Sequence, residues 1–251
     1  MTPPVSHATG DSPGSHGKRV PNPPATPPDD EMLRELNVRF ERATPATILG
    51  WAWEHFQPAI IASSSFQTQS LLLLDMIARL APQMPVVFVD TGFHFSETLE
   101  FRDAIQRELG LNVRTISAKS ASDETPKLYQ HDPDACCRRN KVDPLKAALV
   151  GMRAWISGIR RDQSAVRRQT DIVTRLPTGL VKVCPFANMP QPQVDRFIQS
   201  WRLSVHPLTA RGYASISCGP CTQPCEDSSR NGRWSNSNKS ECGLHEPGAF
   251  S

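Results

Sequence analysis

Short apolar runs alternate along this chain with segments in which apolar residues recur at helical spacing. The runs at 59–62 and 86–89 are uniformly apolar and only four residues long, which is typical of buried strands. We predict five strands, at 59–62, 86–89, 113–116, 154–159 and 181–183. The predicted helices cover 31–40, 71–80, 97–109, 140–150 and 193–201, and Gly110 closes the third. This alternation predicts an α/β fold with a mostly parallel, Rossmann-like sheet and helices on both faces.

Both ends of the chain depart from this pattern. Residues 1–30 contain eight of the 23 prolines and almost no large apolar side chains, so we predict a disordered extension. The nucleotide-binding α/β domain is expected over 31–217. From about Tyr213 the chain is rich in Gly, Ser, Asn and Cys and has no periodicity. We therefore predict that 218–251 is a flexible C-terminal tail that binds a metal group and carries the catalytic residue.

Composition narrows the function classes. The 251 residues are 38% hydrophobic and 21% charged, and their net charge of +3 gives no argument for nucleic acid. No apolar run approaches the roughly 20 residues that cross a membrane, and no secretory signal is visible, so we expect a cytoplasmic protein. In a reducing compartment, seven cysteines are expected to be metal ligands or catalytic thiols. Whether the chain forms a homo-oligomer stays open.

Four of the cysteines have the spacing of a metal site. Cys136 and Cys137 are adjacent, and Cys218 and Cys221 form a Cys-x-x-Cys turn whose two thiolates can reach one centre. Four thiolates can hold either a zinc ion or a [4Fe–4S] cluster. The adjacent pair favours the cluster, because structural zinc sites normally use two spaced pairs.

Another cysteine has the setting of a nucleophile. Cys242 lies outside the set of four, in a polar segment beside Lys239 and His245, and an exposed thiol near cations is reactive. The alternative is an incidental surface cysteine. Cys184 follows an apolar strand and is interpreted as a small buried hydrophobe, and Cys225 as a bystander.

Two segments at predicted strand ends are candidates for anion binding. Residues 63–70 join a strand to a helix, where hydroxyl and backbone N–H groups can converge on an anion; the alternative is a serine-rich helix cap. Residues 90–92 follow the next strand, where open α/β sheets bind ligands, and Ser96 and Glu97 beyond them are interpreted as a helix cap. The candidate substrate-binding residues here are Ser63, Ser64, Ser65, Asp90, Thr91 and Gly92.

Arginines supply the charge that such a ligand needs. Arg160 and Arg161 leave the end of a buried strand, and Arg230 and Arg233 lie in the tail. Guanidinium groups match sulfate and phosphate oxygens in a bidentate manner. The pair at 167–168 is interpreted as a solvated charge run.

Taken together, these segments resemble the thioredoxin-dependent adenylyl-sulfate reductases and the related phosphoadenylyl-sulfate reductases. The resemblance covers roughly residues 45–245. The motifs that carry it are Ser63-Ser64-Ser65-Phe66, Asp90-Thr91-Gly92, Cys136-Cys137-Arg138-Arg139-Asn140-Lys141-Val142, Gly158-Ile159-Arg160-Arg161-Asp162-Gln163-Ser164, Cys218-Gly219-Pro220-Cys221, Gly232-Arg233-Trp234 and Glu241-Cys242-Gly243-Leu244-His245. Departures from the family pattern include Gln67-Thr68-Gln69 in place of an acidic pair and Ser96 in place of a proline.

The resemblance implies an adenine-nucleotide α-hydrolase-like fold with a [4Fe–4S] cluster on the four cysteines. It implies that Cys242 is the catalytic nucleophile. It implies substrate contacts from Lys141 near the cluster, Arg160 or Arg161, Arg230, Arg233 and His245.

The expected reaction is reduction of adenosine 5′-phosphosulfate to sulfite and AMP, through an S-sulfocysteine that reduced thioredoxin or glutaredoxin resolves. The alternatives are reduction of the 3′-phosphorylated nucleotide and a non-enzymatic metal-binding module. A tRNA thiolase is disfavoured because residues 63–70 contain no glycine.

Overall fold

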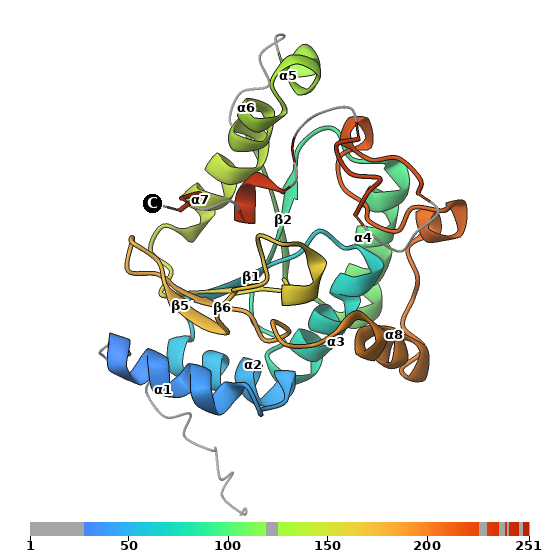
Figure 1. Ribbon diagram of the computed structural model, residues 1–251. Helices are drawn as coiled ribbons and strands as arrows, with labels where there is room; N and C mark the ends of the chain where they lie inside the picture. Colours follow the sequence, from blue (N-terminus) through green and yellow to red (C-terminus); the bar gives the residue numbers. More distant parts are fainter. Residues whose placement is uncertain are drawn as a thin grey trace, which may run out of the picture.

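The structure, a computed structural model, describes residues 28–118, 125–225, 230–235, 239, 241–245 and 248–250. Residues 1–27 of the extension predicted at 1–30 lie outside the described residues, and its end was placed too late, since Asp29 caps α1 and Asp30 begins it. The described part is built on one six-stranded sheet with the strand order β3-β2-β1-β4-β6-β5 (Figure 1). The strands are β1 Ile60–Ser63, β2 Val86–Asp90, β3 Val113–Ser117, β4 Ala154–Ser157, β5 Val173–Arg175 and β6 Val181–Val183.

All neighbouring strands run parallel except the pair β5 and β6. The chain order reverses at β1, which lies between β2 and β4. In open α/β sheets, ligands bind outside the carboxyl ends of the strands at such a reversal. Ser63 and Ser157 are register partners at these ends of β1 and β4, so the topology itself indicates where a ligand belongs.

Helices cover the two faces of the sheet unequally. Residues on one side of β1 and β4, such as Ile60 and Ile156, pack in the main core with α1 to α4 and α8. Residues on the other side, such as Ile61 and Trp155, pack with α7 and with the C-terminal Phe250. The α-helices are α1 Asp30–Phe40, α2 Pro45–Phe56, α3 Leu71–Leu80, α4 Ser96–Leu109, α5 Thr125–His131, α6 Pro133–Cys137, α7 Asp143–Leu149 and α8 Gln191–Ser200.

Shorter turns of helix connect these elements. A π-helix, Arg138–Val142, joins α6 to α7. The 3₁₀ turns are η1 Thr68–Ser70, η3 Arg161–Gln163, η4 Pro207–Arg211, η5 Gly219–Cys221 and η6 Gly243–His245. No helix in the described residues is long and apolar enough to cross a membrane.

The predicted elements are all present, with shifted ends, and several others were missed. The predicted strand at 154–159 ends at Ser157, and the predicted helix at 140–150 begins earlier, as a π-helix at Arg138. Gly110 closes α4 in the left-handed conformation, as predicted. The interpretation of Ser96 as a cap is wrong, since Phe95 is the N-cap and no side chain caps the helix. The helices α2, α5 and α6 and the strand β5 were not predicted.

Helix α1 protects the edge of the sheet through one side chain. The Asn37 amide donates to the carbonyl oxygen of Val173 (2.8 Å) and accepts from its N–H (2.9 Å). Val173 lies in β5, whose other edge pairs with β6. The amide thus replaces a neighbouring strand at this position, which satisfies backbone groups that an exposed edge would leave unpaired.

Replacing Asn37 with Ala should lower the free energy of unfolding by about 1–3 kcal/mol, because two backbone groups at this edge lose their partners. Denaturant unfolding measures the change. The matched control is Val38→Ala on the same helix, where the side chain is 77% exposed and the expected change is within about 0.5 kcal/mol. Equal effects of the two substitutions would contradict this role for Asn37.

Candidate active site

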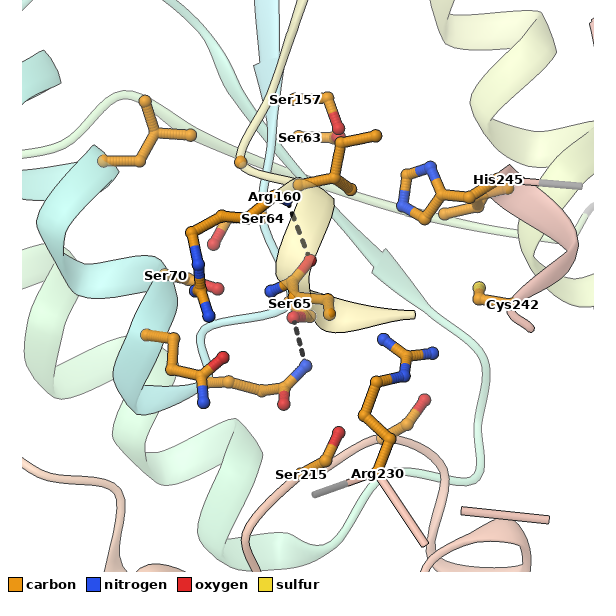
Figure 2. A pocket seen from close by; sticks show the side chains of 18 of the residues that line it. Ser63, Ser64, Ser65, Ser70, Ser157, Arg160, Ser215, Arg230, Cys242 and His245 are labelled. Carbon is orange, nitrogen blue, oxygen red and sulfur yellow. Dashed lines mark hydrogen bonds between the residues drawn. The ribbon is translucent and has the colours of Figure 1, made fainter. Parts of the chain in front are cut away.

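A cavity of about 440 Å³ opens at the carboxyl ends of β1 and β4. In Figure 2, Ser64, Ser70 and Arg160 lie on one side of this cavity, and Cys242 and His245 lie on the other. The first group follows β1 and β4, and the second belongs to the C-terminal tail. The fold therefore brings residues 63–70 and the predicted nucleophile to one site, although some 170 residues separate them in the sequence.

The four serines of residues 63–70, called the serine segment below, line the cavity, and none of them caps a helix with its side chain. Ser70 is the N-cap of α3 but makes no capping hydrogen bond with its side chain. Ser64 Oγ accepts from the Phe66 N–H (3.1 Å), and Phe66 is held at a φ of +52° with its ring fully buried. A buried aromatic ring that fixes an unfavourable backbone conformation is typical of a preorganised binding loop. The anion-binding interpretation of Ser63, Ser64 and Ser65 thus fits their placement better than the cap.

Residues 90–92 lie elsewhere. Asp90 accepts a hydrogen bond from the Gly92 N–H (2.9 Å), which forms the predicted tight turn. The Thr91 hydroxyl lies 3.2 Å from Cys218 Sγ, so the turn faces the cysteines, and none of the three residues lines the main cavity. Of the three, Thr91 adjoins the cysteine site, while Asp90 and Gly92 line neither cavity, so their interpretation as substrate-binding residues stays a prediction.

His94 occupies the place that this turn was expected to fill, and the sequence analysis missed it. It lines the main cavity, and its Nε2 lies 3.0 Å from the Val89 carbonyl oxygen. Its other ring nitrogen is buried without a partner. Burial, reinforced by the charge of Lys141, lowers the pKa of His94 to about 4, so the ring is neutral at pH 7.

The two arginines that follow β4 have different roles. Arg160 lines the cavity, is 3% exposed, and pairs with Asp162 (3.1 Å). Arg161 points away and pairs with Glu41 in the loop after α1 (2.6 Å). Arg160 is thus the member of the pair that faces the site, and Arg161 is corrected to a structural residue.

The tail contributes two more cations to the cavity. Arg230 and Arg233 both line it, and the Nε of each is buried without a hydrogen-bond partner. Burial lowers the pKa of both, that of Arg230 to about 10. Both guanidinium groups are charged at pH 7, so the buried donors of these two side chains suit an anionic ligand.

Glu241 binds the tail to the domain. Its carboxylate is 2% exposed and accepts a two-pronged ion pair from Arg167 (2.7 and 3.0 Å) and a further ion pair from Arg230 (2.8 Å). The same carboxylate accepts from the hydroxyl of Ser164 and from the N–H of Cys242, both at 2.7 Å. Burial alone would raise the pKa of Glu241, but the two arginines lower it to about 2. Arg167 is therefore buried and paired, and its interpretation as part of a solvated run is wrong.

The turn that carries Cys242 packs closely on the segment that contains Cys137 and Val142. Cys242 is partly exposed and lines the cavity. A Cβ at Gly243 would lie 3.2 Å from Val142 Cγ2 and 3.4 Å from Cys137 Cβ, so a larger residue would crowd this contact. The missing side chain lets the turn that carries Cys242 lie directly against the segment with the adjacent cysteines.

The cationic residues predicted beside Cys242 were Lys239 and His245, but other residues supply the positive charge in its cavity. His245 is partly exposed with its Nδ1 buried, and its ring stacks on Trp155 (6.4 Å between ring centroids). Burial of the imidazole lowers its pKa well below the ordinary value. It is therefore neutral at pH 7. Lys239 pairs with Asp134. The cations that share the cavity with Cys242 come from other segments, namely Lys141, Arg160, Arg167, Arg230 and Arg233.

The four cysteines with metal-site spacing line one small, apolar cavity. Cys136 and Cys137 end α6, Cys218 is the N-cap of η5, and Cys221 is its last residue. The Gly219 N–H donates to the Phe93 carbonyl oxygen (2.7 Å), which fixes the Cys-x-x-Cys turn to the loop after β2. The Cys-x-x-Cys turn and the adjacent pair therefore face one another, as their spacing suggested.

The electrostatics of these thiols centre on Lys141. Its ammonium group is buried and donates to the Ser217 hydroxyl (2.7 Å). Burial raises the pKa of Cys137 to about 11 and also raises that of Cys136. Burial has the same tendency at Cys218, but Lys141 and the Thr91 hydroxyl reverse it and lower the pKa. Lys141 lines both cavities and so adjoins both the cysteine site and the Cys242 site.

Whether the four thiols hold a metal group, and which one, stays a prediction at this point. Among the described residues, no three Cys, His, Asp or Glu side chains are arranged to hold a single metal ion. A zinc ion needs its ligands close around one atom, whereas a cubane cluster takes one thiolate at each of four iron corners and suits thiols that surround a cavity. Cys184 is outside this group and is 1% exposed, which confirms it as a buried small residue.

Comparison with known proteins identifies the family. Residues 59–224 match the family described as the phosphoadenosine phosphosulfate reductase domain. This chain belongs to that family. Over 227 residues it is 38% identical to an adenosine 5′-phosphosulfate reductase of Streptomyces coelicolor, which covers 86% of this chain and 95% of the relative. The protein of that name from Salinibacter ruber is 36% identical over 88% of this chain and 91% of its own length.

Solved structures show the fold. A phosphoadenylyl-sulfate reductase from Candida auris, in a phosphate complex, superposes with a TM-score of 0.69 at 24% identity, over 79% of this chain and 99% of that one. The FMN adenylyltransferase of Candida glabrata with an ATP analogue gives a TM-score of 0.54 at 12% identity, over 89% and 82% of the two chains. The adenine-nucleotide α-hydrolase-like fold that the resemblance implied is confirmed.

Replacing Glu241 with Gln should lower the free energy of unfolding by about 3 kcal/mol, because the buried Arg167 loses its compensating charge. The control is Glu97→Gln, which makes the same chemical change in the exposed ion pair with Arg211 and should cost less than about 1 kcal/mol. Thermal or denaturant unfolding of the two variants compares the costs. A loss at position 241 no larger than at position 97 would show that the carboxylate does not hold the tail.

Proposed function

We propose that this chain is an adenosine 5′-phosphosulfate reductase in which Cys242 takes the sulfonyl group from the nucleotide. The observation that carries the proposal is the shared cavity: the Cys242 thiol, the serine segment and the tail arginines all line it. The relatives at 33–38% identity that carry this name are matched over most of their length.

The charge of the cavity suits a phosphosulfate. Five cationic side chains line it, against one carboxylate, that of Asp162, among its described lining residues. The buried Nε groups of Arg230 and Arg233 have no partner among the described residues, so anionic oxygens of the ligand would complete their hydrogen bonding. The serine hydroxyls and the backbone at the end of β1 complete the anion site from the opposite side.

The first step is an in-line displacement at sulfur. The Cys242 thiolate forms an S–S bond to the sulfonyl group, and the bond from that sulfur to the bridging phosphate oxygen breaks, which releases AMP. Negative charge moves from the thiolate to the phosphate, so no strong acid is required. Arg230 and Arg233 lie where they can stabilise this charge, and the neutral His94 and His245 bound the cavity without competing for the anion.

The second step is thiol exchange, and it needs a reduced dithiol protein such as thioredoxin or glutaredoxin. One thiolate of that protein attacks Cys242 Sγ, and sulfite leaves with the electron pair of the S–S bond. The second thiol then resolves the mixed disulfide and returns Cys242 to its reduced form. The reductase is thus expected in a compartment that keeps thioredoxin reduced, such as the cytoplasm.

We propose further that Cys136, Cys137, Cys218 and Cys221 hold a [4Fe–4S] cluster. The proposal is supported by four thiols that line one apolar cavity. When bound, the cluster supplies a fixed charge beside the reaction and no electrons, because the dithiol protein supplies both. Lys141 is the residue of this chain that adjoins both sites, and its ammonium group would orient the substrate.

Replacing Cys242 with Ser should abolish sulfite release from adenosine 5′-phosphosulfate in the presence of reduced thioredoxin, because the nucleophile is lost. Cys225→Ser is the control, since Cys225 does not line the cavity, and it should keep its activity within about twofold. Each variant is assayed for sulfite with both nucleotides. Sulfite release by the Cys242 variant would overturn the assignment, and a preference of the unaltered enzyme for the 3′-phosphorylated nucleotide would favour the alternative substrate.

Anaerobically purified protein should be brown and contain about four iron and four sulfide per chain. Replacing Cys218 with Ser should remove most of the absorbance near 400 nm, because the cluster loses a ligand, whereas Cys225→Ser should retain it. Iron and sulfide analysis together with the absorption spectrum measures both. A colourless protein that contains zinc would contradict the cluster.

A further inference from the structure

Phe250 is a buried aromatic residue that the proposed reaction does not use. Phe250 is 8% exposed and packs in the apolar cluster on the face of the sheet covered by α7. In Figure 1, the C-terminal segment lies beside α7.

The pocket that receives Phe250 is well defined. Its ring lies 4.8 Å from the Trp155 ring, between centroids, and the Lys146 ammonium nitrogen lies 5.9 Å from the Phe250 centroid. Leu145 and Leu149 of α7 belong to the same cluster, and Leu244, two residues after Cys242, packs against it. The tail is thus fixed to the same apolar surface both directly after the nucleophile and at its last described residue.

Trp155 links this surface to the reaction site. Its indole N–H donates to Ser63 Oγ in the serine segment (2.8 Å), and its ring stacks on His245 at an interplanar angle of 8°. Phe250 itself does not line the cavity. Its contacts can therefore influence Cys242 through the placement of the tail and not through contact with a ligand.

We propose that Phe250 is a positioning residue: it docks the C-terminal tail on Trp155 and α7 and thereby holds Cys242 at the cavity. Glu241 fixes the tail on one side of Cys242 by ion pairs, and Phe250 fixes it on the other by apolar burial. The role in catalysis rests on the proposed function, in which Cys242 must face the nucleotide in one step and a dithiol protein in the next. Docking of the tail favours attack of Cys242 on the nucleotide. In the second step, the docked tail shields Cys242 from the dithiol protein.

The first test does not depend on the reaction. Anaerobic holoenzyme is treated with iodoacetamide, and alkylation of Cys242 is followed by peptide mass spectrometry. Phe250→Ala should raise the rate roughly tenfold, since burial of a phenylalanine side chain is worth at least about one power of ten in an equilibrium constant. Phe250→Leu keeps an apolar side chain and should remain within about threefold of the unaltered enzyme. Val150→Ala, at a position that is 79% exposed, is the control and should change nothing.

The second test separates docking from loss of structure. In single turnovers, Phe250→Ala should slow formation of the S-sulfocysteine roughly tenfold, and it should leave release of sulfite by a dithiol unchanged or faster. A variant that is merely damaged would be slower in both steps. Equal losses in both steps, or an alkylation rate equal to that of the unaltered enzyme, would overturn the proposal. If the unaltered enzyme forms no S-sulfocysteine, the proposed function fails, while the alkylation rates still decide the role of Phe250.

Discussion

The site depends on one buried carboxylate. Glu241 precedes Cys242. Its ion pair with Arg167 joins the tail to the loop after β4, and its ion pair with Arg230 lies within the tail. Without that charge, two guanidinium groups would be buried close together with little compensation. With it, the Cys242 N–H is fixed to the same carboxylate, so the ion pairs of Glu241 also position the backbone of Cys242, the proposed nucleophile. The tail and the cavity are therefore parts of one electrostatic unit.

The candidate site consists of two neighbouring cavities. The larger one gathers the serine segment, the arginines and Cys242, and the smaller one gathers the four cysteines. Lys141 lies between them, and the close contact at Gly243 keeps the nucleophile's turn against the adjacent cysteines. In the proposed reaction, a metal cluster in the smaller cavity would influence the larger cavity through Lys141 and the contact at Gly243. It would not transfer electrons.

Local sequence patterns predicted most of the strands and helices and some of the residues of the candidate site. Uniform apolar runs identified the strands, and Cys-x-x-Cys spacing identified cysteines that do share a cavity. The helix α2 was missed although Thr44 and Pro45 form an ordinary helix start, and β5 was missed because three residues carry no period. Contacts between residues that are distant in the sequence could not be predicted. No local pattern distinguishes Arg160 from Arg161. None shows that Glu241 pairs with a buried Arg167, or that Phe250 packs on Trp155. These choices are made by packing between segments that are distant in the sequence.

The central claim is that Cys242 and no other thiol receives the sulfonyl group. The direct measurement mixes anaerobic enzyme with adenosine 5′-phosphosulfate in the absence of reductant and locates the adduct by mass spectrometry of the intact chain and its peptides. The account predicts one added SO₃ group per chain, on the peptide that contains Cys242, with an equal amount of AMP released. An adduct on another cysteine, or AMP release without any adduct, would contradict it.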